Sequence, residues 1–223
     1  MEEKDMLKEA KEIEKEPDVE KDSRNSLWWV LGIFLALLLI MMAVPYYGVK
    51  LDPRPSEIPG MDIIPAVEAG QHDFSVESPY DYEKLMKSSD PVIKQLADNI
   101  AAYGCSGNKI CHAKAEFYFV RDNFNYINDP ASVEYVKSAK ESLVSRGGDC
   151  DDSSVLLANL LEAAGVETRF VFVPGHVYIE AYLPSALNRY KMDGDWVALD
   201  AACKSCEFGE LSYNVVKADK RYV

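Results

Sequence analysis

An uncharged run of eighteen residues, 27–44, constrains the fold of this chain more than any other feature. The run reads LWWVLGIFLALLLIMMAV and is long enough to cross a bilayer as one helix. Two tryptophans at its start, and Tyr46 and Tyr47 after its end, match the aromatic belts of membrane spans, and we expect Pro45 to end the helix. A buried core helix of this length would show a polar stripe. The sequence therefore predicts a transmembrane helix over residues 27–45.

Basic residues are distributed unevenly around this span, which bears on its orientation. Lys8, Lys11, Lys15, Lys21 and Arg24 precede it, whereas Lys50 and Arg54 follow it. The positive-inside rule then predicts a single-pass membrane protein with its N-terminus in the cytoplasm and its main domain outside. A cleaved signal peptide is the alternative, but the apolar run is long for one and the leader is acidic. The lipid bilayer is thus the first expected partner, through residues 27–45.

Two polar segments flank the span. Residues 1–26 hold ten acidic and six basic residues, too polar to form a core, and they predict a solvated cytoplasmic tail. A partner-binding helix is the alternative for this tail. Residues 46–79 contain five prolines and no helical period, which predicts an extended stalk, although scattered apolar residues would also let the segment wrap along the domain. The domain itself is predicted over residues 80–223.

The overall composition excludes some classes of function. The 223 residues carry a net charge of −13, which argues against binding a nucleic-acid backbone. The sequence has no phosphate-binding glycine loop and no His-Glu-x-x-His zinc motif. We therefore expect no nucleic-acid partner and no cofactor. The length allows one domain of ordinary size beside the membrane segment.

Residues 147–164 place a cysteine where a polar loop becomes an apolar helix. Asp149 is the expected N-cap, apolar residues recur at three- and four-residue spacing, and Gly165 stands where a helix stop is expected. Cys150 then lies in the first turn, where unsatisfied backbone N–H groups favour the nucleophilic thiolate. Neighbouring aspartates disfavour a second negative charge, so activation needs an imidazolium partner as well.

A histidine and an aspartate follow in three runs that predict strands. These runs are rich in β-branched and aromatic residues and cover residues 168–174, 176–183 and 195–200. They predict adjacent antiparallel strands, in which the start of the second run lies beside the end of the third. His176 begins the second run and Asp200 ends the third. Asp200 can therefore hold the imidazole of His176 while the helix presents Cys150 to the other ring nitrogen.

Three motifs in this region resemble the core of the transglutaminase-like cysteine enzymes. They occur in the family order and are Gly-Asp-Cys-Asp-Asp from Gly148, Gly-His-Val-Tyr-Ile-Glu from Gly175 and Trp-Val-Ala-Leu-Asp from Trp196. The resemblance is strongest over residues 113–201. It implies an α+β, papain-like core in which a helix bearing Cys150 packs on an antiparallel sheet bearing His176 and Asp200. It further implies that Cys150 is the nucleophile, His176 the general base and acid, and Asp200 the residue that orients the histidine.

These features predict a membrane-anchored, extracytoplasmic enzyme that acts on amide bonds through an acyl-enzyme. Hydrolysis and transfer to an amine use the same residues, so both a peptidase and a transglutaminase-type acyltransferase are compatible with the motifs. The expected substrate is a peptide or protein at the cell surface, and the backbone N–H of Cys150 is one candidate oxyanion donor. The alternative is an inactive descendant of the fold that serves as a binding or scaffold domain at the membrane.

The other four cysteines, Cys105, Cys111, Cys203 and Cys206, predict two disulfides. An oxidising compartment outside the membrane would pair them and leave Cys150 free, with their connectivity left open. The alternative is a four-cysteine zinc site, because the Cys-x-x-Cys spacing of the second pair suits tetrahedral ligation. The wider spacing of the first pair is less typical of such a site. A redox-active Cys-x-x-Cys is disfavoured because no thioredoxin-like strand and helix surround it.

Upstream of the cysteine helix, the apolar pattern predicts three more helices. They cover residues 80–87, 91–103 and 112–126. The polar segment 130–140 precedes the nucleophile loop, and we expect it to line one wall of the cleft.

Overall fold

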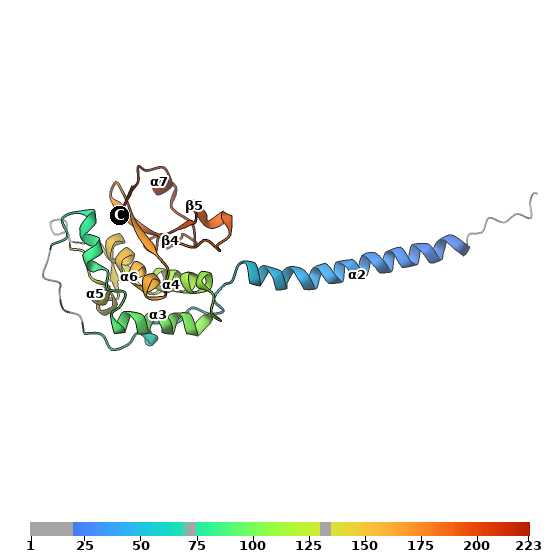
Figure 1. Ribbon diagram of the computed structural model, residues 1–223, viewed down its shortest axis with the longest axis horizontal. Helices are drawn as coiled ribbons and strands as arrows, with labels where there is room; N and C mark the ends of the chain where they lie inside the picture. Colours follow the sequence, from blue (N-terminus) through green and yellow to red (C-terminus); the bar gives the residue numbers. More distant parts are fainter. Residues whose placement is uncertain (1–19, 69, 71–74, 130–134) are drawn as a thin grey trace, which may run out of the picture. The chain divides into compact units, whose positions relative to one another are not determined.

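The computed structural model of the protein describes residues 20–68, 70, 75–129 and 135–223. Most of the predicted tail therefore lies outside the described residues, as do Phe74 of the predicted stalk and part of the polar segment 130–140. The chain divides into two compact units, Met1–Gly48 and Val49–Val223. Each unit is described by itself (Figure 1).

One long helix, α2 (Glu20–Leu51), accounts for the described part of the first unit. Its stretch Ser26–Gly48 has a mean hydropathy of 2.7 and is not buried by other parts of the chain, so it has the length and composition of a membrane span. The helix continues through Pro45, and the expectation that this proline ends it was wrong. A proline already has a helical φ and removes one backbone donor, and such a residue is tolerated within membrane-type apolar helices.

The second unit is built on a five-stranded antiparallel sheet with the strand order β5-β6-β4-β3-β7. The strands are β3 (Thr168–Val173), β4 (His176–Tyr182), β5 (Lys191–Asp193), β6 (Trp196–Leu199) and β7 (Arg221–Tyr222). A separate parallel pair joins β1 (Asn125–Tyr126) to β2 (Gly147–Gly148). The prediction of three neighbouring antiparallel strands is confirmed, with β4 between β3 and β6.

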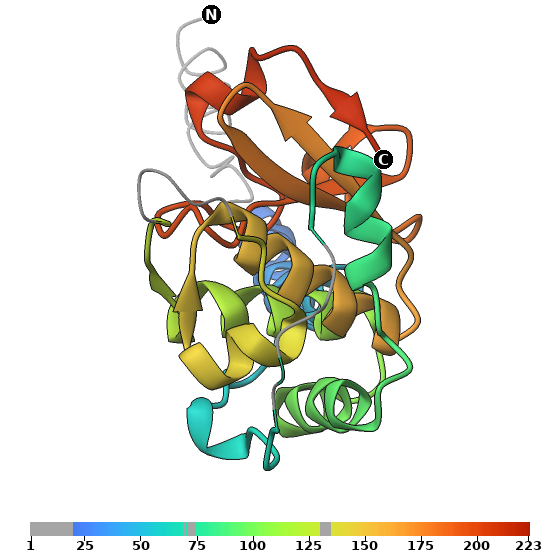
Figure 2. The same cartoon turned by 90° about the vertical axis from the view of Figure 1, so that its left-hand side faces the viewer.

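Helices pack on the sheet. The α-helices of this unit are α3 (Pro91–Gly104), α4 (Lys109–Asn123), α5 (Ala139–Ser145), α6 (Cys150–Ala163) and α7 (Tyr213–Val216), and the 3-10 helices are η1 (Met61–Ile63), η2 (Pro79–Leu85) and η3 (Asn188–Tyr190). Figure 2 shows α3 to α6 gathered below the sheet, so the unit has one helical layer against one face of the sheet. The observed fold is α+β, as predicted.

Two of the predicted helices differ from the observed ones for local reasons. Helix α4 starts three residues earlier than predicted because the Asn108 side chain accepts a hydrogen bond from the N–H of Ile110 (2.8 Å) and caps it there. It ends at Asn123 because the chain then extends into β1. The segment predicted as a helix over 80–87 is the tighter 3-10 helix η2, which is held by a capping box between Ser78 and Asp81.

Helix α6 lies at the centre of the core, as its apolar periodicity predicts. Its N-cap is Asp149, whose carboxylate accepts from the N–H groups of Asp151 and Asp152. Its end is set by Gly165, which has a φ of 77° that a residue with a side chain rarely adopts. Between these ends, the fully buried apolar side chains are those of Val155, Leu156, Leu157, Ala158, Leu160 and Leu161.

The two faces of the sheet bury different clusters. One face packs on the helices through Phe170, Val177, Ile179, Ala181, Val197 and Leu199. The opposite face carries Val171, Tyr178 and Ala198, which pack against Val215 of α7. His176 is the first residue of β4 and lies at the end of the sheet next to Cys150, the first residue of α6. The functional residues therefore gather at one end of this layered core.

The segment that follows α2 packs along the domain, which was one of the two structures that the sequence allowed for it. Ile58, Ile63, Ile64 and Val67 contact the main core. Backbone and side-chain hydrogen bonds hold the same segment: the N–H of Ser56 donates to the carbonyl of Gly104 (2.9 Å), Asn99 to Ile63 (3.3 Å) and Asn123 to Pro59 (3.2 Å). These contacts bury apolar side chains that a free stalk would expose to water.

Asp52 holds the start of this segment through a buried ion pair. Its carboxylate accepts hydrogen bonds from Lys114, Arg189 (2.6 Å) and the hydroxyl of Tyr190 (2.9 Å). The Lys114 side chain is 2% exposed and that of Asp52 is 13% exposed. The ammonium group also lies 4.9 Å from the centre of the Tyr190 ring. Burial by itself would raise the pKa of Asp52, but its hydrogen bond to Lys114 and the other contacts lower it below its usual value.

We expect Asp52→Asn to destabilise the domain by about 3 to 5 kcal/mol at neutral pH, because it leaves the buried Lys114 ammonium without its counter-charge. Since the folded-state pKa of Asp52 is lowered, the stability that it contributes is present above pH 3.8 and is lost as the pH falls through the folded-state pKa. Chemical denaturation at several pH values measures this. Asp98→Asn is the matched control, because Asp98 is 65% exposed and pairs with an exposed lysine at 3.8 Å. Equal effects of the two substitutions would contradict the prediction.

Candidate active site

Cys150 is the first residue of α6 and is a free thiol in a half-buried position. Its Sγ lies 3.6 Å from Oδ1 of Asp151, in hydrogen-bonding geometry. The N-cap Asp149 bonds the N–H groups of Asp151 and Asp152, and the N–H of Cys150 belongs to the same first turn. The thiol therefore sits at the positive end of the helix, as the sequence predicts.

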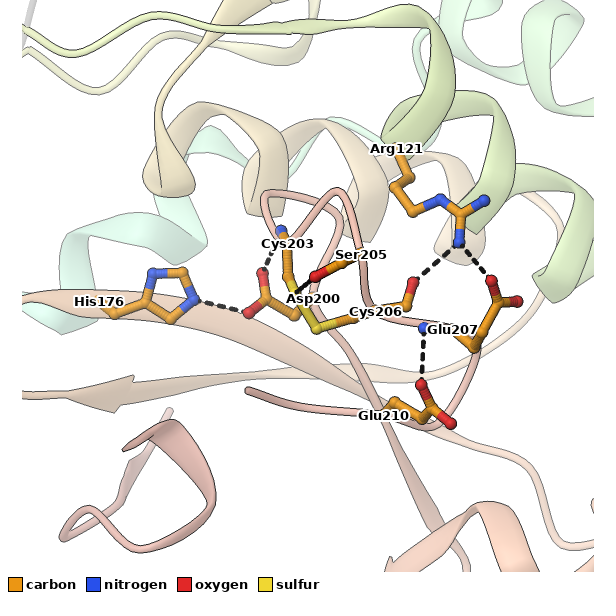
Figure 3. The surroundings of a disulfide bond; sticks show 8 residues. All are labelled: Arg121, His176, Asp200, Cys203, Ser205, Cys206, Glu207 and Glu210. Atoms are coloured by element: carbon orange, nitrogen blue, oxygen red, sulfur yellow. Dashed lines mark hydrogen bonds and ion pairs between the residues drawn. A yellow bond between two sulfur atoms is a disulfide. The ribbon is translucent and has the colours of Figure 1, made fainter. Parts of the chain in front are cut away.

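His176 and Asp200 meet because of the register between β4 and β6. These strands run antiparallel with Ile179 opposite Leu199, so the beginning of β4 lies beside the end of β6. Nε2 of His176 is 2.8 Å from Oδ2 of Asp200 (Figure 3). The Asp200 carboxylate is almost fully buried at 2% exposure, whereas the histidine ring is 20% exposed. A fixed, buried carboxylate thus orients a ring whose Nδ1 remains for another partner.

The electrostatics of the site favour a charged imidazole. Burial by itself would lower the pKa of His176, but hydrogen bonds to Asp200 and Cys150, together with the charges of these two groups, raise it to about 10. Of the two ring nitrogens, Nε2 is the one bonded to Asp200. Cys150 and His176 line one cleft, so the three side chains that the sequence predicted come together in one place. At neutral pH, this raised pKa favours the imidazolium form of His176 beside the Asp200 carboxylate.

A serine that the sequence reasoning missed links the helix to the sheet beside these residues. The hydroxyl of Ser154, one turn after Cys150 on α6, donates to the carbonyl of Val177 at 3.2 Å. Val177 follows His176 directly, so this bond fixes the N-terminal part of α6 against the start of β4. The signal was available in the sequence as a small polar residue four positions after Cys150, on the same face of the helix.

The third aspartate of the motif, Asp152, has a structural role that the sequence did not reveal. It is 1% exposed and accepts hydrogen bonds from the backbone N–H (2.7 Å) and the ammonium group of Lys137. Burial raises its pKa, and the bonds to Lys137 oppose this rise. A Cβ at Gly148 would lie 2.1 Å from the Asp152 carboxylate, so only glycine fits there. Asp152 therefore fastens the described end of the segment 130–140 to the nucleophile helix.

Cys150 and His176 line the same cleft, which has a volume of about 520 Å³. Aromatic side chains form much of its wall, from Tyr82 of η2, Tyr126 of β1 and Phe172 of β3. Tyr82 packs edge-on to Phe172, with ring centres 4.9 Å apart. Burial raises the pKa of both tyrosines, and the nearby acidic groups add to this, so both phenols stay protonated and can donate hydrogen bonds. The cleft therefore combines a thiol–imidazole pair with apolar walls and hydroxyl donors.

The cysteines and acidic groups also bear on metal binding. The other four cysteines form two local disulfides, Cys105–Cys111 and Cys203–Cys206, which leaves no thiolate for the four-cysteine zinc alternative. Among the described residues, ligand atoms of Asp149, Cys150 and Asp151 lie within 4.8 Å of one another and could hold a metal ion. The carboxylate of Asp149 is already bonded to two N–H groups of the helix, and that of Asp151 to the Cys150 thiol.

A helix that presents a thiol at its first turn, packed on an antiparallel sheet that presents a histidine and an aspartate, is the arrangement of the papain-like cysteine enzyme fold. Within that class, residues 94–201 match the family model of the transglutaminase-like superfamily. Residues 94–201 therefore form a transglutaminase-like domain. The match contains all three motifs that carried the resemblance in the sequence, and it begins earlier, within α3.

Solved bacterial structures show a weaker likeness to the chain. A "Putative Cysteine Protease" from Cytophaga hutchinsonii has 21% identity and a TM-score of 0.40, with 53% of this chain and 39% of that one covered. Legionella pneumophila LapG has 20% identity and a TM-score of 0.40, with coverage of 59% and 76%. The periplasmic domain of TgpA from Pseudomonas aeruginosa has 16% identity and a TM-score of 0.39, with coverage of 57% and 50%. No curated protein sequence matches significantly.

Proposed function

We propose that this domain is a cysteine enzyme that cleaves amide bonds, with Cys150 as nucleophile, His176 as general acid and base, and Asp200 as the residue that orients the histidine. The observation that carries the proposal is the placement of His176, which is bonded to a buried carboxylate and lines the same cleft as the thiol of Cys150. Its raised pKa supports a resting state in which the proton of the thiol is held by the imidazole.

In the proposed reaction, the Cys150 thiolate attacks the carbonyl carbon of the scissile amide. The N–H of Cys150 is one donor that can stabilise the developing oxyanion, because it lies at the positive end of α6. The His176 imidazolium gives its proton to the leaving amine as the C–N bond breaks. The neutral imidazole then takes a proton from the incoming nucleophile, which attacks the thioester and releases Cys150.

Water or a second amine can serve as that incoming nucleophile, and the same residues would support either outcome. We propose hydrolysis as the principal reaction. The domain is small, and the described cleft of about 520 Å³ holds a short stretch of peptide. The proposed substrate is a peptide or protein at the cell surface. Release of a free carboxylate from a peptide in the presence of excess amine, measured against formation of the amide product, distinguishes hydrolysis from transfer.

Labelling with iodoacetamide, a small thiol-reactive amide, separates this enzyme from a non-catalytic scaffold. We expect Cys150 in the folded chain to react near neutral pH much faster than in the unfolded chain, and to lose this advantage in His176→Ala. The other four cysteines are in disulfides, so the label reports Cys150. A labelling rate equal to that of the unfolded chain would favour the scaffold.

We also propose that α2 anchors the enzyme in the membrane, with the N-terminus in the cytoplasm and the domain outside. The unburied apolar stretch Ser26–Gly48 and the basic residues before it support this orientation. With epitope tags at both termini, external protease should remove the C-terminal tag from intact cells or spheroplasts and spare the N-terminal tag until detergent is added. Loss of the N-terminal tag alone would require the opposite orientation.

A further inference from the structure

A tight turn follows Asp200 directly and is closed by the Cys203–Cys206 disulfide. The N–H of Cys203 donates to the backbone carbonyl of Asp200 at 3.2 Å, and the N–H of Cys206 to the carbonyl of Cys203 at 3.1 Å. Cys206 is 6% exposed and Asp200 is 2% exposed. The bridge therefore closes a partly exposed turn immediately after the buried carboxylate that holds His176 (Figure 3).

This turn binds the Asp200 carboxylate as well as its backbone. The N–H of Cys203 also donates to Oδ1 of Asp200 at 3.2 Å, while Oδ2 faces Nε2 of His176 at 2.8 Å. The two oxygens of one carboxylate are thus held by the turn and by the histidine. Since a carboxylate rotates about a single bond, holding Oδ1 sets the direction in which Oδ2 points.

The turn is itself fastened to the end of α4. Nη1 of Arg121 donates to the carbonyl of Cys206 at 2.8 Å. In the opposite direction, the ammonium group of Lys204 bonds the carbonyls of Arg121 and Phe124 at the C-terminus of α4, where helix carbonyls lack backbone partners. The turn therefore has two polar attachments to a helix whose apolar side chains are buried in the core.

We propose that the Cys203–Cys206 turn is a positioning element of the active site, which holds Asp200, and through it His176, in the reactive orientation. This inference rests on the proposed function. The bridge spans only three residues, so it restricts the unfolded chain less than a bridge across a longer loop would. Its main effect is therefore local, on the position of the Cys203 N–H against Asp200.

The second disulfide supplies a matched control for this inference. Cys105–Cys111 joins residues six apart between α3 and α4 and is likewise a short local bridge. Among the described contacts, neither of its cysteines bonds Cys150, His176 or Asp200. The double variant C105A/C111A therefore removes a comparable bridge without touching the positioning of Asp200.

The test compares the two double variants, C203A/C206A and C105A/C111A, through the pKa of His176 measured by NMR and through kcat and KM with a peptide substrate. We expect C203A/C206A to lower the pKa of His176 from about 10 toward its ordinary value of 6.5 and to lower kcat about 10-fold or more with little change in KM. We expect C105A/C111A to change neither the pKa nor kcat by a similar amount. An unchanged pKa in C203A/C206A, or equal falls in both variants, would overturn the inference.

A further variant covers the case in which C203A/C206A does not fold. Lys204→Met keeps the bridge and removes one attachment of the turn to α4. We expect it to lower the pKa of His176 in the same direction, and an unchanged pKa would overturn the inference. Because the NMR titration requires no turnover, it separates the two claims. A bridge-dependent pKa in a protein without activity would contradict the proposed function and support the positioning role.

Discussion

Replacement of Cys150 by alanine should abolish turnover and leave the domain folded. The thiolate is the atom that would form the covalent bond to the substrate, so its loss should lower kcat by about 10⁴-fold or more. Cys150 is half-buried at the end of a helix, and its removal opens no large cavity in the core. His176→Ala should have a similar effect, because the thiolate then loses both its counter-charge and the proton donor for the leaving amine.

Thermal unfolding followed by circular dichroism checks that these variants remain folded. Ser145→Ala is a useful control, because Ser145 is a polar residue at the end of α5, and its hydroxyl bonds only the carbonyls of Ser142 and Gly147 among the described contacts. It should retain most of the activity. Full activity in a folded Cys150→Ala protein would exclude Cys150 as the nucleophile.

Asp200→Asn should lower kcat by about 10³- to 10⁴-fold without removing activity entirely, because the imidazole remains present in the wrong orientation or tautomer. The same change should lower the pKa of His176 from about 10 toward 6.5, since it removes a buried negative charge at 2.8 Å. The matched control is Asp195→Asn at the other end of β6. Asp195 has a 40% exposed side chain that pairs with Lys191, and it does not contact the histidine in the described structure.

This substitution should also change how stability depends on pH. The folded-state pKa of His176 is raised above its unfolded value, so the stability that it contributes is fully present below pH 6.5 and is lost as the pH rises through about 10. Chemical denaturation between pH 6 and 10 should therefore show a fall in the free energy of unfolding that is shallower in Asp200→Asn than in Asp195→Asn. Identical pH dependence and activity in the two variants would remove Asp200 from the site.

The parts of the fold that the sequence predicted are those with local causes. The period of apolar residues, an aspartate before the helix and a glycine after it defined α6 to within one residue. Alternation and turn residues defined β3, β4 and β6, and their antiparallel order then brought His176 beside Asp200. Each of these signals lies within a few residues of the element that it specifies.

The parts that the sequence did not reveal depend on contacts between distant residues. Nothing in the local pattern around Lys137 indicates that it pairs with Asp152, and Ser154 bonds a carbonyl 23 positions along the chain. The packing of the segment after α2 likewise depends on Asp52, whose partner Lys114 lies 62 positions away. Helix continuation through Pro45 was missed for a different reason, because a proline disfavours a helix without always ending it.

The most direct test of the central claim is to trap the acyl-enzyme. The domain is mixed with p-nitrophenyl acetate, an activated ester that acylates reactive thiols, quenched in acid and analysed by intact-mass and peptide mass spectrometry. The proposed mechanism predicts one acetyl group on the peptide that contains Cys150, none in Cys150→Ala and much slower formation in His176→Ala. No adduct on Cys150, or an adduct that forms as quickly in the unfolded chain as in the folded one, would contradict it.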